Sequence, residues 1–273
     1  MSEYLSPESQ AAGFPDLRPH FRHLHNRKMP HSAHNVCSDF ADAEFGDPIL
    51  GIYKNCGFQT RDEVSIQWRY AKQVVGEGAT FLDIGAHTGW VSLHFAYADG
   101  NPPLESPDPD RVGDARDAIA VFAVDPMYRS VDERFAKRFV ENTQAANHRM
   151  FMFAMNSVEL VEHPAFGRAV FGGVSVDGDH EKPWPLHDVM LAHDHLAGDG
   201  FIALHDAWGE PVAEAARWLL QMGYKVQWYD TPHGLVVARR GNVKLEPHTP
   251  DPGERAAFAA KRRATNFPFE RCS

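Results

Sequence analysis

From residue 80 to residue 239, short apolar segments alternate with segments of helical spacing, and this alternation constrains the fold more than any other feature of the chain. Strands separated by helices of this length form a parallel sheet covered by helices on both faces. The Pro-His-Gly turn before the last segment suits an antiparallel hairpin. The sequence therefore predicts an α/β fold with a doubly wound, mostly parallel, seven-stranded sheet and an antiparallel terminal hairpin. The expected strands are 80–84, 119–124, 149–154, 172–176, 201–204, 224–229 and 234–239, and the expected helices are 63–75, 91–98, 130–146, 185–196 and 212–222.

The remaining segments predict an organisation around one α/β domain. Residues 1–58 begin with a stretch rich in Pro, His, Ser and Asn, which indicates an N-terminal arm that is extended or partly irregular. The domain itself is expected over 59–240, with a polar, Pro- and Asp-rich inserted loop over 99–118. Residues 241–273 form a tail, with a short helix expected around 254–264.

Composition narrows the classes of partner. The 43% of hydrophobic residues can build a sizeable core, and no run of 18 apolar residues is present to span a membrane. The net charge of −10 argues against nucleic acid, since nucleic-acid binding depends on neutralising phosphates, and it favours a small-molecule substrate. The three cysteines indicate reduced thiols, and the N-terminus has no signal-peptide pattern, so a cytoplasmic location is expected. A homo-oligomer in which the arm exchanges between subunits stays open.

The segment TFLDIGAHTGW over residues 80–90 runs from an apolar strand through two glycines into a helix. Gly85 and Gly89 allow the backbone to turn sharply and to approach a ligand closely. A dinucleotide-binding loop would read G-x-G-x-x-G, and this loop lacks that spacing. It places a carboxylate, Asp83, at the end of the strand and His87 in the turn. A carboxylate suits a ligand with a cationic amine and no phosphate, and S-adenosylmethionine (SAM) is such a ligand.

Two further strand ends offer contacts for a nucleoside. Asp125 ends the second strand, 40 residues after Gly85, where a carboxylate can accept hydrogen bonds from both ribose hydroxyls. The alternative role for Asp125 is a helix cap or a turn before Pro126. Asn156 and Ser157 follow the third strand, where they either contact an adenine ring or cap a short helix.

Acidic residues and imidazoles follow the fourth and fifth expected strands. Asp177 and His180 come after 172–176, and His205 and Asp206 come after 201–204. Because these strands are neighbours in such a sheet, we expect Asp177, His205 and Asp206 to hold a divalent metal such as Mg²⁺ or Mn²⁺. Two alternatives stay open: His180 or His205 acts as a general base without a metal, or the polar residues only cap strand and helix ends.

The chain resembles the class I SAM-dependent methyltransferases over residues 60–240. The sequence Asp-Gly-Asp-His over 177–180, with the later Gly-Phe-Ile-Ala-Leu-His-Asp over 200–206, is similar to the methyltransferase-24 group, which includes macrocin-type O-methyltransferases acting on sugars of natural products. The loop DIGAHTGWVSL is also similar to that of the FkbM-type methyltransferases. The resemblance implies SAM as the cofactor and a methyl transfer to a hydroxyl group.

The resemblance also assigns roles to residues. Asp177 and Asp206 match the acidic positions of metal-dependent relatives, and His205 stands where a carboxylate is usual, which favours Mn²⁺ or Fe²⁺ over Mg²⁺. The catalytic residues are expected to be Asp177, His180, His205 and Asp206, and the cofactor-binding residues Asp83, Gly85, His87, Gly89, Asp125, Asn156, Ser157 and Asp177.

The sequence thus predicts a SAM-dependent O-methyltransferase acting on a small molecule. Two alternatives remain, a nicotinamide-dependent oxidoreductase on a Rossmann-like fold and a SAM-binding module without catalytic activity. The missing G-x-G-x-x-G and the His-Asp pair after the fifth strand count against the oxidoreductase.

Overall fold

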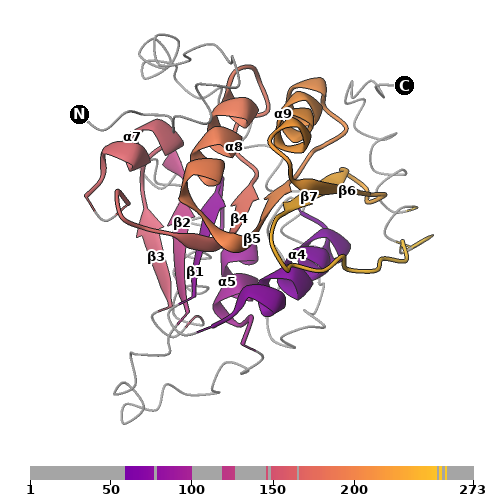
Figure 1. The fold of residues 1–273 in the computed structure, drawn as a ribbon, viewed down its shortest axis with the longest axis horizontal. Helices are drawn as coiled ribbons and strands as arrows, with labels where there is room; N and C mark the ends of the chain where they lie inside the picture. The colour runs from indigo at the N-terminus through magenta and orange to yellow at the C-terminus, as the bar shows by residue number, and fades with distance from the viewer. Residues whose placement is uncertain are drawn as a thin grey trace.

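A seven-stranded sheet organises the part of the chain that the computed structural model describes, which is residues 59–76, 79–99, 119–126, 146, 149–164, 166–250, 252–253 and 256. The strand order is β3-β2-β1-β4-β5-β7-β6 (Figure 1). The strands β1 to β5 pair in parallel, whereas β7 pairs antiparallel with both β5 and β6. The predicted α/β class, the mostly parallel sheet and the antiparallel hairpin are confirmed.

The strand order reverses at the centre of the sheet, since β2 and β4 flank β1 on opposite sides. In open α/β sheets, ligands bind beyond the carboxyl ends of the strands at such a switch point. The ends of β1, β2 and β4 therefore meet where a ligand is expected. The strands are β1 (Thr80–Ile84), β2 (Ala120–Val124), β3 (Met150–Phe153), β4 (Phe171–Val176), β5 (Leu196–Leu204), β6 (Lys225–Tyr229) and β7 (Leu235–Arg239).

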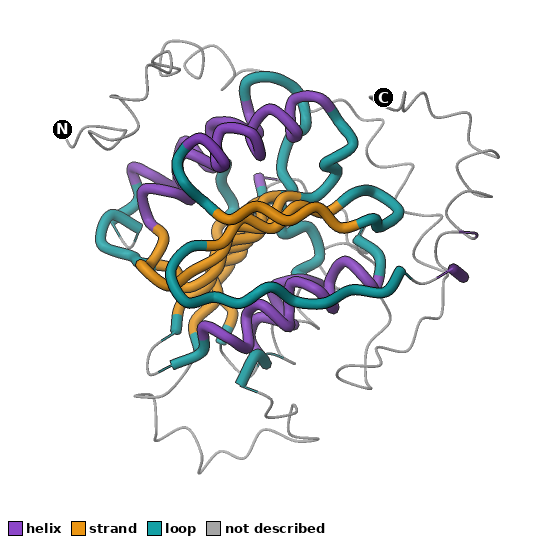
Figure 2. The backbone as a smooth tube through the Cα atoms, turned by 45° about the vertical axis from the view of Figure 1, so that its right-hand side comes forward, coloured by secondary structure: helices purple, strands orange, loops and turns teal. Residues whose placement is uncertain are grey.

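Helices cover both faces of the sheet (Figure 2). Alternate residues of β1 supply the two resulting cores, because successive side chains of a strand point to opposite faces. Leu82 and Ile84 pack with the buried residues of α8 and α9, whereas Phe81 packs with those of α4 and α5. The helices are α4 (Arg61–Val74), α5 (Trp90–Ala96), α7 (Ser157–Glu162), α8 (Trp184–His195) and α9 (Glu210–Gln221).

The largest difference from prediction is at β5, which begins at Leu196 rather than at residue 201. The helix α8 ends at His195, so the strand follows it directly. Gly198 and Gly200 broke the apolar pattern in the sequence. A side chain at Gly200 would meet the Gly172 carbonyl oxygen at 2.9 Å, which explains a glycine inside this strand.

The start of α4 also differs from prediction, since the helix begins at Arg61 rather than at residue 63. Thr60 and Glu63 form a capping box, in which the Thr60 side chain accepts from the Glu63 amide and the Glu63 carboxylate accepts from the Thr60 amide. Four predicted segments lie outside the described residues, apart from Asp99, Ala146 and Ala256: the arm 1–58, the insertion 99–118, the helix 130–146 and the tail helix 254–264.

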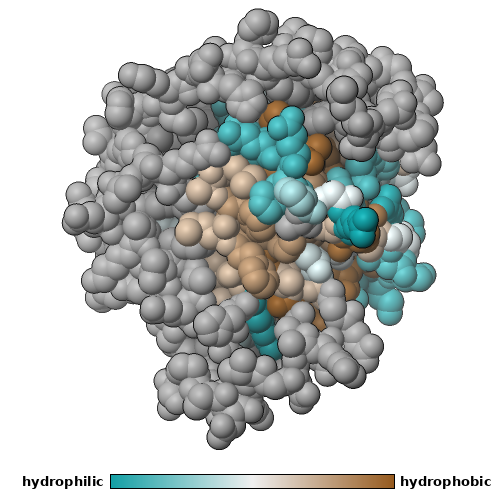
Figure 3. Space-filling model, turned by 90° about the vertical axis from the view of Figure 1, so that its left-hand side faces the viewer, coloured by the Kyte–Doolittle hydropathy of each residue, from teal (hydrophilic) through white to brown (hydrophobic). Residues whose placement is uncertain are grey.

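Figure 3 views the molecule from the β3 side, where apolar residues gather near the centre of the visible face. Phe151 and Met152 of β3 are 48% and 50% exposed. The strand β3 is one end of the sheet described here. Among the described residues, no helix is both long and apolar enough to cross a membrane.

Candidate functional site

The glycine loop joins β1 to α5 through three residues with left-handed backbone conformation. The φ angles are 78° at Gly85, 47° at His87 and 79° at Gly89. A Cβ atom at Gly85 would lie 2.1 Å from the carbonyl oxygen of Asp177, so only glycine fits there. The loop after β1 therefore packs directly on the turn after β4.

Asp83 is held beneath this loop, on the side of α5. Its carboxylate is 1% exposed and accepts a hydrogen bond of 2.6 Å from the Ser92 hydroxyl. Burial, opposed by the hydrogen bond from Ser92, raises the pKa of Asp83 to about 7. Burial also disfavours the charged form of His87 and lowers its pKa to about 4, so its imidazole is neutral at neutral pH.

Asp125 follows β2 and binds the glycine loop. Its Oδ2 atom accepts a 2.9 Å hydrogen bond from the His87 main-chain amide, and the residue is 5% exposed. The structure therefore brings the end of β2 and the loop after β1 together at the switch point, as the sequence predicts for a shared ligand site.

Asn156 and Ser157 follow β3, and the capping alternative is confirmed for Asn156. Asn156 is the N-cap of α7 and forms a capping box with Glu159. The Ser157 hydroxyl lies 3.3 Å from Nδ1 of His187 and is buried. Asn156 thus caps α7, whereas Ser157, the first residue of α7, contacts His187 of α8.

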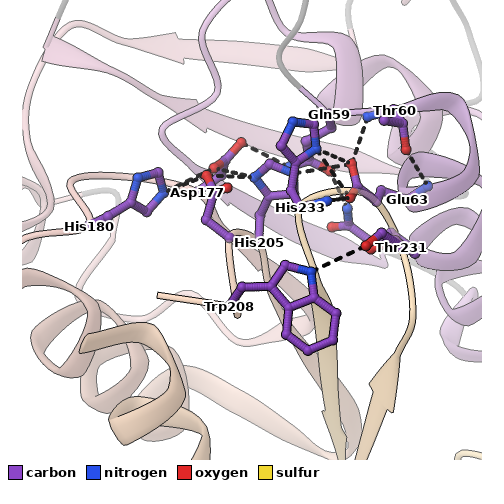
Figure 4. Close-up of polar contacts among 11 residues, drawn as sticks. Gln59, Thr60, Glu63, Asp177, His180, His205, Trp208, Thr231 and His233 are labelled. Carbon is purple, nitrogen blue, oxygen red and sulfur yellow. Dashed lines mark hydrogen bonds and ion pairs between the residues drawn. The ribbon is translucent and has the colours of Figure 1, made fainter. Parts of the chain in front are cut away.

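His205, the residue directly after β5, lies at the centre of a polar cluster (Figure 4). Its Nδ1 atom is 2.9 Å from Oδ1 of Asp177 and 3.2 Å from Oδ2 of Asp206. Its Nε2 atom is 3.1 Å from Oε2 of Glu63. The sequence prediction that Asp177, His205 and Asp206 come together is confirmed by this geometry.

His180 completes the solvent side of the cluster. Its Nε2 atom is 3.4 Å from Oδ1 of Asp177 and 3.2 Å from Oδ2 of Asp206, and its side chain is 44% exposed. Asp206 has a φ of 55°, a conformation that side chains other than glycine adopt rarely and that concentrates at functional sites. By contrast, Asp179 and Glu181 are exposed, and Asp179 accepts a hydrogen bond from the Glu181 amide within the turn.

The carboxylates around His205 determine its charge. Burial alone would lower the pKa of His205, but the charges of Asp177, Asp206 and Glu63 raise that pKa well above its ordinary value. His180 behaves alike, since its hydrogen bond to Asp177 and the charge of Asp206 outweigh burial and raise its pKa. The surrounding carboxylates therefore favour the protonated form of the His205 imidazole.

The same interactions keep the carboxylates ionised. Burial would raise the pKa of Glu63, but His233 and His205 hold it well below its ordinary value. Burial opposes ionisation at Asp177 and Asp206 too, yet the charge of His205 and its hydrogen bonds hold both pKa values below their usual range. A buried set of ionised carboxylates with imidazoles between them is suited to binding a cation or to moving a proton.

Three residues of the site were missed in the sequence: Gln59, Glu63 and His233. Gln59 donates from Nε2 to Oδ2 of Asp177 at 3.0 Å, and His233 donates its main-chain amide to Glu63 at 2.9 Å. The Thr-x-x-Glu pattern over residues 60–63 was readable, but it indicates only a helix cap. Nothing in the spacing of residues 59–63 relates them to a site more than a hundred residues away.

The two tryptophans near the site differ in exposure. Trp90, the first residue of α5, is 3% exposed and packs in the core with residues of α4. Trp208 is 43% exposed, donates from Nε1 to the Thr231 carbonyl oxygen at 3.3 Å, and packs against Gly234. Trp208 thereby ties the segment after β5 to the β6–β7 hairpin.

In the described part of the chain, each of two groups of side chains has donor atoms close enough together to bind a metal ion. The first is Asp177, His180 and Asp206, and the second is Glu63, His205 and His233. Since His205 also contacts Asp177 and Asp206 through Nδ1, it lies between the two groups.

The strand order and the glycine loop at the switch point define a Rossmann-like fold of the methyltransferase type. A structure assigned as a caffeoyl-CoA O-methyltransferase from Staphylococcus aureus has a TM-score of 0.50 at 15% identity, over 83% of this chain and 100% of that chain. The O-methyltransferase TomG from Streptomyces achromogenes, solved with SAM, has a TM-score of 0.46 at 15% identity, over 78% and 100%. A precorrin-6y C5,15-methyltransferase from Geobacter metallireducens has a TM-score of 0.47 at 13% identity, over 71% and 99%.

At these identities the likeness is one of fold. No protein-family model matches this chain, and no curated protein sequence matches it.

Proposed function

We propose that this chain is a SAM-dependent methyltransferase that transfers a methyl group to a hydroxyl of a small molecule. One observation carries the proposal: the glycine loop packs against the main chain of Asp177, and Asp177 also belongs to the cluster around His205. A ligand lying over the loop would therefore have one end beside a set of acidic and basic groups. The fold, which is shared with methyltransferases, fits this proposal.

SAM would lie across the carboxyl ends of β1 and β2. The left-handed turns at Gly85 and Gly89 leave room for close approach of the methionine part. The Asp125 carboxylate would accept from the ribose hydroxyls, and its hydrogen bond from the His87 amide would orient it. Asp83 would act from beneath the loop, by holding α5 in place through Ser92.

The acceptor hydroxyl would bind between the ends of β4 and β5, beside Asp177 and Asp206. Holding the hydroxyl in line with the sulfonium methyl supplies most of the rate enhancement in such a transfer. Without a metal ion, His180 is the better-placed proton acceptor of the two histidines, since it is half-exposed whereas both ring nitrogens of His205 face carboxylates. The second product would be S-adenosylhomocysteine.

The donor set also fits a divalent metal ion. Four donor atoms form a ring: Oδ1 of Asp177, Nδ1 of His205, Oδ2 of Asp206 and Nε2 of His180. The distances between neighbouring atoms, taken in that order and back to Asp177, are 2.9, 3.2, 3.2 and 3.4 Å. Adjacent ligands of a six-coordinate ion with bonds of about 2.1 Å are about 3 Å apart. Two carboxylates and two imidazoles suit Mn²⁺ better than Mg²⁺, which prefers oxygen ligands. When bound, such an ion would lower the pKa of the substrate hydroxyl.

Calorimetric titration with S-adenosylhomocysteine tests the cofactor. We expect micromolar binding, about −8 kcal/mol. Repeating the titration with Mn²⁺ and then with a chelator tests the metal. No binding under any of these conditions would reject the proposal and reopen the nicotinamide-dependent alternative.

Asp125→Ala should weaken S-adenosylhomocysteine binding by about 1–3 kcal/mol, the cost of losing a buried hydrogen-bond partner. The matched control is Glu210→Gln, whose carboxylate pairs with Arg217 on the surface and should leave affinity unchanged. Equal affinities of the Asp125→Ala variant and the wild type would remove the ribose role.

Asp206→Asn should keep S-adenosylhomocysteine binding and suppress methyl transfer. Transfer is measured with methyl-labelled SAM against a panel of phenols, catechols and sugars. Wild-type turnover in the variant would exclude the proposed acceptor site. Cofactor binding with no transfer to any acceptor by the wild type would instead support the non-catalytic SAM-binding alternative.

A further inference from the structure

Glu63 is buried in the middle of the site although it belongs to the first described helix. It lies in the first turn of α4, 142 positions before His205, and its side chain is 0% exposed. A fully buried carboxylate is costly unless hydrogen bonds and opposite charges compensate it. The contacts that compensate Glu63 therefore indicate what the residue is for.

The Glu63 carboxylate contacts N–H donors and imidazole nitrogens. Oε2 accepts from the Thr60 amide at 2.7 Å and lies 3.0 Å from Nδ1 of His233 and 3.1 Å from Nε2 of His205. Oε1 accepts from the His233 amide at 2.9 Å and lies 3.2 Å from Nδ1 of His233. These contacts use the acceptor capacity of a carboxylate, about four lone-pair sites. A metal ion at Glu63, His205 and His233 would have to displace them, so the group is better suited to orienting side chains.

An ionised carboxylate only accepts hydrogen bonds, so Nε2 of His205 must carry a proton to bond with Glu63. The opposite edge of the ring, Nδ1, is then the edge that faces Asp177 and Asp206. A carboxylate that binds the far nitrogen of a histidine fixes both the tautomer and the orientation of the ring.

We propose that Glu63 is a positioning residue that keeps a proton on Nε2 of His205 and directs Nδ1 toward Asp177 and Asp206. The inference rests on the proposed function in one respect, namely that the acceptor hydroxyl or a metal ion would bind beside Nδ1 of His205. Through His233, the same carboxylate holds the β6–β7 hairpin against α4. Glu63 thus connects α4, β5 and the hairpin at one point.

Nitrogen-15 NMR of histidine-labelled protein tests this directly. Wild type should show a slowly exchanging ring N–H proton coupled to Nε2 of His205, assigned by its loss in His205→Asn. In Glu63→Met, which keeps a similar volume but no acceptor, exchange of this proton should accelerate at least tenfold. A wild-type His205 without this protected proton, or an unchanged proton in Glu63→Met, would overturn the inference.

Two further variants separate positioning from helix capping and from misfolding. Thr60→Val removes the cap of the same helix turn without touching His205, so the Nε2 proton should stay protected. If Glu63→Met does not fold, Glu63→Gln replaces it. Even where its amide oxygen stays at the Oε2 position, it is a weaker acceptor than an ionised carboxylate, so we again expect faster exchange, and unchanged exchange would contradict the proposal.

Metal affinity supplies a second readout. Loss of a residue that orients a ligand lowers metal affinity 10- to 100-fold, so Mn²⁺ should bind Glu63→Met that much more weakly, and Thr60→Val within about threefold of wild type. The NMR experiment needs neither SAM nor metal. A wild type that binds neither S-adenosylhomocysteine nor Mn²⁺ would reject the proposed function, while the Nε2 proton would still decide the positioning role.

Discussion

Gly85 shows how one residue joins two parts of the site. Its positive φ is unfavourable for any residue with a side chain, and its Cα lies so close to the Asp177 carbonyl group that a Cβ atom has no space. The first condition is local, and the second depends on β4 lying beside β1. Gly223 meets only the first condition, since among the described residues nothing lies within 4 Å of a Cβ built there.

Gly85→Ala should therefore destabilise the protein more than Gly223→Ala. Both variants lose about 1–2 kcal/mol to the left-handed conformation. Gly85→Ala should lose about 1–3 kcal/mol more, because the loop must move away from Asp177. Urea unfolding of both variants measures the difference, and equal losses would show that the close contact between the loop and the turn after β4 carries no energy.

At the scale of single elements, α4 and α7 both begin with a capping box. Each has a capping box whose cap side chain accepts from the third helical residue and whose Glu accepts in return. In α7 the capping box stabilises only the start of the helix. In α4 the Glu of the box is also the buried partner of His205, so one residue serves both the start of the helix and the site.

Asn156→Ala should lower the free energy of unfolding by about 1 kcal/mol, the usual cost of losing an N-cap. Asn156→Ser should restore most of this loss, since serine caps helices as well. Thermal or urea unfolding measures both. S-adenosylhomocysteine affinity should stay unchanged in both variants, and a loss of affinity without a loss of stability would instead favour the contact with adenine.

At the scale of the whole molecule, the sheet places charges that are far apart in sequence into one buried region. Asp83, on the face toward α5, lies near enough to Asp177 that the charge of Asp177 adds to the rise in its pKa. The unfolded chain releases the Asp83 proton near pH 3.8, whereas the folded protein keeps it until about pH 7. Between these values the folded state binds more protons, so this residue makes stability fall as pH rises.

Asp83→Asn should remove that pH dependence, because an amide resembles the protonated acid and does not titrate. The free energy of unfolding of wild type minus that of the variant should fall by up to about 4 kcal/mol between pH 4 and pH 7, at about 1.36 kcal/mol for each unit of pKa shift. Urea unfolding at several pH values measures it. A constant difference across this range would mean that Asp83 is ionised in the folded protein.

The sequence predicted the strand ends better than the contacts made around them. Asp125, Asp177, His205 and Asp206 were found because polar residues directly after apolar strands meet at one edge of a parallel sheet. The face of the sheet toward which the Asp83 side chain points was not predictable in the same way. Whether a residue near the end of a strand points to a ligand or to a helix depends on which helix covers that face, and here the Ser92 hydroxyl of α5 takes the carboxylate.

The α/β class, the glycine loop and the acidic strand ends could be predicted without coordinates, because hydrophobic periodicity and glycine positions act over a few residues. That Glu63 and His233 belong to the same site as His205 follows from the folded arrangement. Their spacing along the chain carries no such information. The packing of α4 and of the β6–β7 hairpin against β5 creates the contact, and the cost of burying a carboxylate is met only when all three segments are in place.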